Sequence, residues 1–184
     1  SHGDTVSLSY CIDKWGINKS IELLEGMFAI GIWDRQAKCL SLARDFAGIK
    51  PLFYGWNKNG FVFSSQYNQI SNHPFFRDEK VNLSVLKLYI SQHFIPPPFG
   101  LLKNTFSVFP GEIVKLDEHG KLEKIRYWSF PKFENSIMDY NDAKNIIENE
   151  IQNSVKEQLL SDVPLGAFLS GGVDSPLICN YAKN

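Results

Sequence analysis

The first third of the sequence predicts one helix followed by short strands. Residues 5–15 mix apolar and polar side chains without Gly or Pro, which favours a helix, and the apolar residues at 21–24 indicate a further short turn. Short apolar segments then alternate with polar turns, at 27–33, 39–44, 52–56 and 61–65. The last two are joined by Asn59-Gly60, a strong hairpin signal. This pattern predicts an antiparallel sheet covered by the early helix.

The middle of the chain predicts one more helix and one more pair of strands. Residues 81–93 indicate a helix with Leu83, Leu86 and Ile90 on one face. The Pro-rich run at 95–100 cannot continue that helix, so it predicts an extended connection. The alternating residues 112–116, a polar turn and a return over 121–128 predict two further strands.

The pattern changes after a weakly periodic stretch at 131–139. Apolar residues then recur at helical spacing from 143 to 159, with Asn141 as the expected N-cap. The apolar run at 165–169 predicts a strand buried on both faces, and Pro176 marks the start of another helix after a Gly-rich turn. Helix, buried strand, Gly-rich turn and helix together are typical of an α/β nucleotide-binding layer.

The sequence therefore predicts two domains. Residues 1–130 form the first, residues 131–140 form a linker, and residues 141–184 begin the second.

Composition narrows the functional classes. Nineteen basic and twenty acidic residues are scattered along the chain, which argues against binding to nucleic acid. No apolar stretch reaches the roughly 18–20 residues of a membrane-spanning helix, and the first residues lack a signal-peptide pattern. Three widely spaced cysteines, Cys11, Cys39 and Cys179, favour reduced thiols in a cytoplasmic protein.

The run SGGVDS at 170–175 carries the clearest chemistry. Gly171 and Gly172 remove side chains where a backbone approaches an anion closely and adopts unusual dihedral angles. Backbone N–H groups at the start of the next helix would point at that anion, and the hydroxyls of Ser170 and Ser175 add donors. The run therefore predicts a site for polyphosphate.

Asp174 would repel phosphate unless it holds a hard cation such as Mg2+ that bridges the phosphates. No Lys precedes the final Ser, so the run is not a Walker sequence. A plain turn between two elements has a similar composition, and that interpretation stays open.

These residues resemble the pyrophosphate loop of the ATP pyrophosphatase superfamily, whose members activate a carboxylate as its adenylate. Further segments resemble glutamine-hydrolysing asparagine synthetases in the expected order. They are 24–29 with Trp33-Asp34, 43–45 with 48–52, 109–111, 126–128 and 159–166. The resemblance covers nearly the whole chain.

The resemblance implies a class II glutamine amidotransferase followed by a synthetase. The first part would be an α+β Ntn-hydrolase-like glutaminase sandwich lacking its N-terminal part. The second would be the start of an α/β adenine-nucleotide alpha-hydrolase-like synthetase domain. The implied enzyme is a cytoplasmic ligase that hydrolyses glutamine, adenylates aspartate or a related carboxylate with ATP and Mg2+, and amidates the adenylate. AMP and pyrophosphate are released, and a homodimer is left open.

The resemblance also assigns roles to residues. Pyrophosphate and Mg2+ would be held by Ser170, Gly171, Gly172, Asp174 and Ser175. Leu169 would lie against the adenylate by backbone contact. Asp4 resembles the acidic residue that binds the α-amino group of glutamine, although a helix cap beside Thr5 explains it too.

The resemblance places the catalytic nucleophile on an amino-terminal Cys, which this chain does not contain. Ser1 is not Cys, and neither Cys11 nor Cys39 stands at a mature amino terminus. We therefore expect the parent protein to be an enzyme and this chain alone to be inactive.

Two other functions compete with this interpretation. One is a β-lactam synthetase-like ligase, which uses the adenylating loop without a glutaminase. The other is a non-catalytic Ntn-like scaffold, against which the intact Asp174 and both serines argue. Arg44 and Asp45 either shape the glutaminase pocket or the interface between the two halves, or form an ion pair at a strand end, and the ion pair is favoured.

Overall fold

A computed structural model describes residues 3–134 and 138–183, and the chain divides into two units after Pro131. Each unit is described by itself. The predicted linker at 131–140 lies partly outside the described residues, so the predicted domain limits stay a prediction. No helix of the described part is long and apolar enough to cross a membrane.

The first unit begins with helix α1 (Asp4–Glu22), which has a break inside it. Gly16 has a φ of 77°, a left-handed conformation that glycine adopts without a Cβ clash. The predicted helix at 5–15 is therefore confirmed. Of the residues expected to form a further short turn, Ile21 and Glu22 end the helix and Leu23 lies in a turn.

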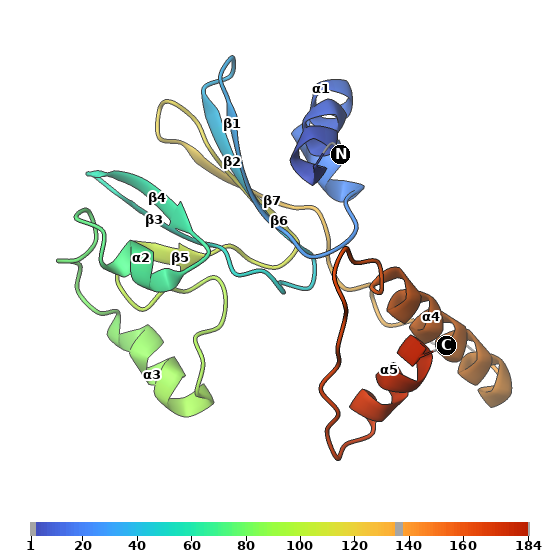
Figure 1. Cartoon of the computed structure of the whole chain (residues 1–184). Coiled ribbons are helices and arrows are strands. Elements are labelled where there is room, and N and C mark those ends of the chain that lie inside the picture. Colours follow the sequence, from blue (N-terminus) through green and yellow to red (C-terminus); the bar gives the residue numbers. More distant parts are fainter. Residues whose placement is uncertain (1–2, 135–137, 184) are drawn as a thin grey trace. The chain divides into compact units, whose positions relative to one another are not determined.

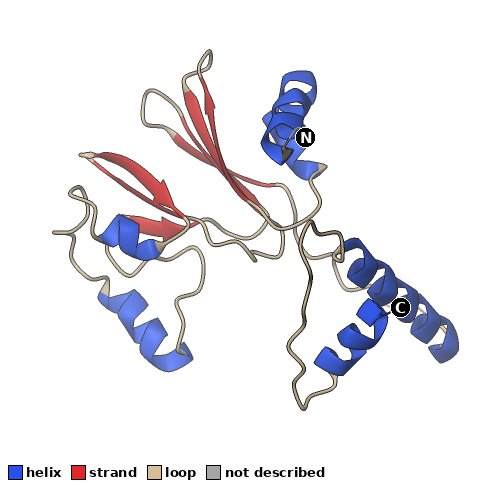
Figure 2. Cartoon of the chain, in the orientation of Figure 1, coloured by secondary structure: helices blue, strands red, loops and turns tan. Residues whose placement is uncertain are grey.

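The strands form two antiparallel sheets (Figures 1 and 2). Sheet A has the order β1 (Ala29–Asp34), β2 (Cys39–Arg44), β6 (Glu112–Leu116), β7 (Leu122–Arg126). Sheet B has the order β4 (Gly60–Ser64), β3 (Phe53–Asn57), β5 (Thr105–Ser107). The expectation that the first four strands share one sheet is wrong, because the connection from β2 to β3 is not a tight turn but a crossing from sheet A to sheet B.

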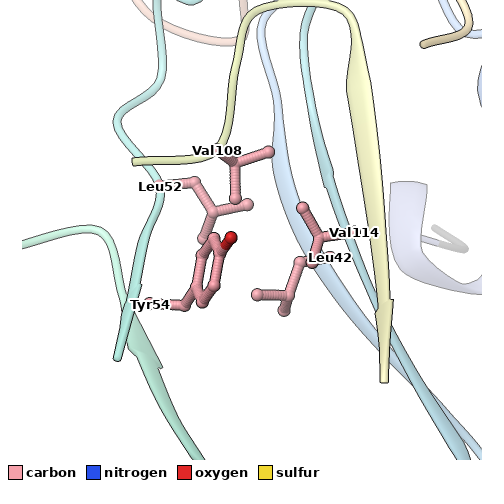
Figure 3. Packing of buried hydrophobic residues seen from close by; sticks show 5 residues of the cluster. All are labelled: Leu42, Leu52, Tyr54, Val108 and Val114. Carbon is pink, nitrogen blue, oxygen red and sulfur yellow. The ribbon is translucent and has the colours of Figure 1, made fainter. Parts of the chain in front are cut away.

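Three layers bury the apolar faces of this unit. Ile21 of α1 packs against Ala43 and Ile113 on one face of sheet A, which confirms that the early helix covers a sheet. The other face of sheet A packs on sheet B, where Leu42 and Val114 meet the buried residues Leu52, Tyr54 and Val108 (Figure 3). Removal of these apolar surfaces from water holds the layers together.

Two helices follow β4. The predicted helix at 81–93 is confirmed as α3 (Leu83–Gln92), and a short helix α2 (Tyr67–Ser71) precedes it. The face that carries Leu83 and Ile90 is not buried, because these two residues are 68% and 66% exposed whereas Val85 is buried. Periodicity identifies an apolar stripe but does not identify the element that would cover it. The Pro-rich run at 95–100 contains no helix, as predicted.

The second unit contains two helices, α4 (Tyr140–Glu157) and α5 (Asp174–Lys183). The N-cap of α4 is Asp139, whose carboxylate accepts a hydrogen bond from the backbone N–H of Asn141 at 2.9 Å. The prediction that Asn141 itself is the cap is therefore wrong.

The predicted strand at 165–169 is not formed, and Phe168 and Leu169 are exposed. A strand requires a neighbour to share its backbone hydrogen bonds, and the described residues of this unit contain no other strand. The apolar run therefore has no regular secondary structure.

Candidate functional site

The SGGVDS loop lies on the surface of the second unit and leads into α5. Residues 170–174 are exposed and Ser175 is half-buried. The Oγ atoms of Ser170 and Ser175 lie 2.9 Å apart, so one hydroxyl donates to the other. The backbone N–H of Gly172 donates to the Ser170 Oγ at 3.3 Å. These two hydrogen bonds join the ends of the loop and leave its outer surface open to an anion.

The two glycines of the loop do not have the unusual dihedral angles expected from the sequence. Neither Gly171 nor Gly172 is among the described residues with positive φ. A Cβ at Gly171 would meet nothing within 4 Å, and one at Gly172 would come no nearer than 3.5 Å, to the Ser170 Oγ. Neither strain nor crowding within the described chain therefore requires glycine here. The glycines leave free space beside the backbone at 171 and 172, and a ligand in contact with the main chain would occupy this space.

Asp174 is the first residue of α5. Its side chain is exposed and makes no ion pair or hydrogen bond with the residues that the structure describes. Its position in the first turn of the helix is favourable for a negative charge. No group of three His, Cys, Asp or Glu side chains able to hold a metal occurs among residues 3–134 and 138–183. A cation at Asp174 would therefore rely mainly on ligand and water oxygens, as Mg2+ bound to phosphates does.

Helices α4 and α5 pack together, and α5 follows the loop. The Tyr181 hydroxyl donates to Glu148 Oε1 at 3.1 Å. A mostly apolar cavity of about 890 Å³ lies between the two helices and residues 165–167, with Ile151, Val155 and Ile178 in its wall. Leu169, which precedes the loop, is 69% exposed. Its backbone is accordingly free to contact a ligand at the loop.

Asp4 lies in the first turn of α1, in the other unit. The N-cap position belongs to Gly3, and no side chain makes a capping hydrogen bond there, so the alternative role of Asp4 as a cap is wrong. Asp4 is exposed and lines a groove of about 710 Å³ between α1 and the start of β1, together with Cys11, Glu25 and Met27. Its carboxylate is available to a cationic group in that groove.

Arg44 and Asp45 are both buried, and they do not form the expected ion pair. The Arg44 guanidinium instead donates to the carbonyl oxygens of Lys50, Gly48 and Val108 at 2.8, 2.7 and 2.8 Å. The Asp45 carboxylate accepts from the backbone N–H groups of Ile49 and Lys50, each at 2.9 Å. The two side chains satisfy backbone groups of the crossing between the sheets, which is a structural role.

Comparison with known families agrees with both units. Residues 1–128 match the glutamine amidotransferase domain family, and residues 147–184 match the asparagine synthase family. These matches confirm the predicted fold class, a glutaminase of the amidotransferase type followed by the start of a synthetase domain. The predicted roles of single residues are not tested by them.

Individual relatives are glutamine-hydrolysing asparagine synthetases by name. A putative glutamine-hydrolysing asparagine synthetase of Methanocaldococcus jannaschii is 33% identical over 98% of this chain and 35% of its own length. An asparagine synthetase of Bacillus subtilis is 30% identical over 97% of this chain and 29% of its own length. The chain thus spans about a third of the length of these relatives.

Among solved structures, the glutamine phosphoribosylpyrophosphate amidotransferase of B. subtilis, complexed with ADP and GMP, matches 98% of this chain and 37% of its own. The identity is 16% and the TM-score is 0.46.

Proposed function

The chain belongs to the glutamine amidotransferase domain family, and from this premise we propose that it supplies the glutaminase and the first ATP-binding loop of an asparagine synthetase. The observation that carries the proposal is the open SGGVDS loop at the start of α5, in the part of the chain that matches the asparagine synthase family. The activity is that of the protein containing the chain, which transfers the amide nitrogen of glutamine to aspartate or a related carboxylate with ATP.

The loop would hold the pyrophosphate part of ATP. Ser170 and Ser175 offer hydroxyl donors, and the bare backbone at Gly171 and Gly172 lets phosphate oxygens approach the main chain. Because the loop precedes α5, the partial positive charge of that helix terminus adds to these donors. The backbone of Leu169 would lie against the adenylate at the near side of the loop.

Asp174 would hold Mg2+ on the phosphates. Its exposed carboxylate has no protein partner among the described residues, and it stands two positions after Gly172. When bound, Mg2+ supplies positive charge that neutralises the phosphate oxygens. Without that ion the carboxylate would oppose the binding of ATP, so we expect binding to depend on Mg2+.

Asp4 would bind the α-amino group of glutamine at the groove between α1 and β1. The support is its exposed carboxylate in the wall of that groove. We assign the catalytic nucleophile of glutamine hydrolysis to no residue of this chain. The cytoplasmic location, the homodimer and the absence of nucleic acid and membrane partners stay predictions.

The decisive experiment is aspartate-dependent exchange of labelled pyrophosphate into ATP by the full-length protein that contains this chain. We expect exchange, and at least a hundredfold loss in the Asp174→Ala variant, because charge neutralisation at the phosphates is lost. Asp162→Ala, an exposed aspartate of the same unit, is the matched control and should retain exchange. The assignment would be refuted by a protein that shows no aspartate-dependent exchange, or by an exchange rate that Asp174→Ala leaves unchanged.

Hydrolysis of glutamine is tested separately, by release of glutamate. Asp4→Asn should raise the KM for glutamine at least tenfold and change kcat less, because the residue binds the substrate at a distance from the reacting amide. Asp13→Asn, on the same helix and exposed, should leave both constants unchanged. Equal effects of the two substitutions would contradict the role of Asp4. A protein that performs the exchange reaction but hydrolyses no glutamine would support the β-lactam synthetase-like alternative.

A further inference from the structure

A buried carboxylate in the first unit lies opposite an arginine without pairing with it. Glu112 of β6 is 6% exposed, and Arg126 of β7 is its direct partner in the strand register. Opposite charges at such positions normally attract across the two strands. Yet neither residue takes part in any ion pair within the described part of the chain.

Aromatic rings hold the neighbouring cations in place. The Arg126 guanidinium stacks on Phe109, with its Cζ 4.2 Å from the ring centroid. The Lys124 ammonium lies over Phe106 at 5.7 Å and over Tyr54 at 6.0 Å. Such contacts are attractive but leave N–H groups unused. Neither cationic group donates a hydrogen bond to a residue that the structure describes.

An open cavity of about 370 Å³ is present at these charges. Its wall is formed by Pro98, Phe109, Glu112, Lys124 and Arg126. Glu112 is its buried member, and both cations are solvent-exposed. The volume falls at the small end of ligand sites. The cavity therefore offers one buried anionic group and two exposed cationic groups to the same small molecule.

The electrostatics of Glu112 are consistent with a missing counter-ion. Burial raises the pKa of its carboxyl group, and the positive charges of Lys124 and Arg126, together with a backbone hydrogen bond at Phe109, only partly oppose that effect. A buried charge without a close counter-ion is unfavourable. A ligand that brought a cationic group to the carboxylate would offset this cost, provided that the other end of the ligand was not repelled by Lys124 and Arg126.

We propose that this cavity binds a small α-amino acid, with its ammonium group on Glu112 and its carboxylate on Arg126 and Lys124. An anion alone would face the buried carboxylate, and a cation alone would face the two positive side chains. A zwitterion satisfies both ends. The inference rests on the Glu112 cavity and is independent of the function proposed for the loop.

The test is a titration of the 184-residue protein, followed by the backbone amide signals of residues 109, 111–113 and 124–126 in nuclear magnetic resonance spectra. Glycine, acetate and methylammonium are the probes. Glycine should bind with a dissociation constant of about 1 mM. Acetate and methylammonium should bind at least about tenfold more weakly, because each lacks one of the two charge-assisted contacts.

Variants separate the two ends of the ligand. Glu112→Gln should weaken the binding of glycine at least about tenfold without weakening the binding of acetate. Arg126→Gln should weaken the binding of both probes. Glu123→Gln is the control, because Glu123 alternates to the opposite face of β7 and should leave glycine binding unchanged. Acetate binding as tight as glycine binding, or glycine binding unaffected by Glu112→Gln, would overturn the proposal. Because Arg126 is exposed, its variant tests the site even if Glu112→Gln alters the fold.

Discussion

The hydroxyl oxygens of Ser170 and Ser175 lie 2.9 Å apart, so the residues at the two ends of the SGGVDS run are joined directly. Ser170 also accepts the N–H of Gly172, which makes it the more connected of the two serines. A ligand bound at the loop would therefore meet a turn whose shape depends chiefly on one hydroxyl. This difference between two similar side chains can be measured.

We expect Ser170→Ala to weaken the binding of Mg2+-pyrophosphate more than Ser175→Ala. The first substitution removes the acceptor of Gly172 and the contact with Ser175, whereas the second removes only that contact. Each hydrogen bond contributes about 1 kcal/mol, so the two variants should differ about fivefold in affinity by calorimetry. Ser161→Ala is the control, because its Oγ accepts the N–H of Val163 in a similar turn outside the loop. An equal loss in all three variants would contradict a special role for Ser170.

Arg44→Lys should destabilise the first unit by about 2–3 kcal/mol. Arg44 satisfies three carbonyl oxygens through a planar guanidinium, and a lysine ammonium cannot reach all three. Urea unfolding followed by tryptophan fluorescence measures the change. Arg35→Lys, at an exposed position in the turn after β1, should change stability by less than about 0.5 kcal/mol. If Arg44→Lys behaves like Arg35→Lys, the connection between the sheets does not depend on the guanidinium.

Glu112→Gln should stabilise the protein at neutral pH and lose this advantage in acid. Burial raises the pKa of Glu112 in the folded state, so the folded protein binds that proton more tightly than the unfolded chain does. The stability contributed by the protonated carboxyl is complete below the unfolded pKa of about 4.3 and is lost as the pH rises through the folded value. The glutamine variant keeps a neutral side chain at every pH.

The measurement is the urea midpoint of both proteins between pH 4 and pH 7. The difference between variant and wild type should be near zero at the acid end and should grow as the pH rises. Glu123→Gln, at an exposed position of β7, should show no such trend. A constant difference across the range would mean that the proton on Glu112 is not involved.

Local patterns in the sequence predicted most of the individual elements. The predicted strand at 39–44 coincides with β2, and the predicted strand at 112–116 coincides with β6. The SGGVDS loop is also recognisable in the sequence, because two glycines beside serines and an aspartate form a local motif, but the roles of its residues stay a prediction. The three residues of β5 were missed because so short a segment carries no usable alternation.

What the sequence could not supply depends on contacts between distant residues. At the crossing between the two sheets, the buried Arg44 donates to the carbonyl oxygen of Val108, which is 64 positions away. The strand at 165–169 was predicted from its apolar composition, but composition does not provide a partner strand. The Glu112 cavity emerges only when β6 and β7 are placed in register, so a single acidic residue at the start of an alternating segment gave no signal of a site.

Gly171→Ala is the substitution that best separates folding from ligand binding. A methyl group there would meet nothing within 4 Å, and the backbone of Gly171 does not require positive φ, so stability should stay within about 0.5 kcal/mol of wild type. The methyl group would nevertheless occupy the space that a phosphate oxygen needs beside the main chain. We therefore expect at least tenfold weaker binding of Mg2+-pyrophosphate by calorimetry, with an unchanged thermal midpoint.

Gly55→Ala provides the contrast, since its Cβ would come within 2.7 Å of the buried Phe76 ring and should cost about 1–3 kcal/mol of stability. Because Gly55 lies in sheet B, that loss of stability should leave pyrophosphate affinity unchanged wherever the protein is folded. If Gly171→Ala binds pyrophosphate as well as wild type does, the bare backbone at this position is not a phosphate contact, and the glycine pair is only a turn.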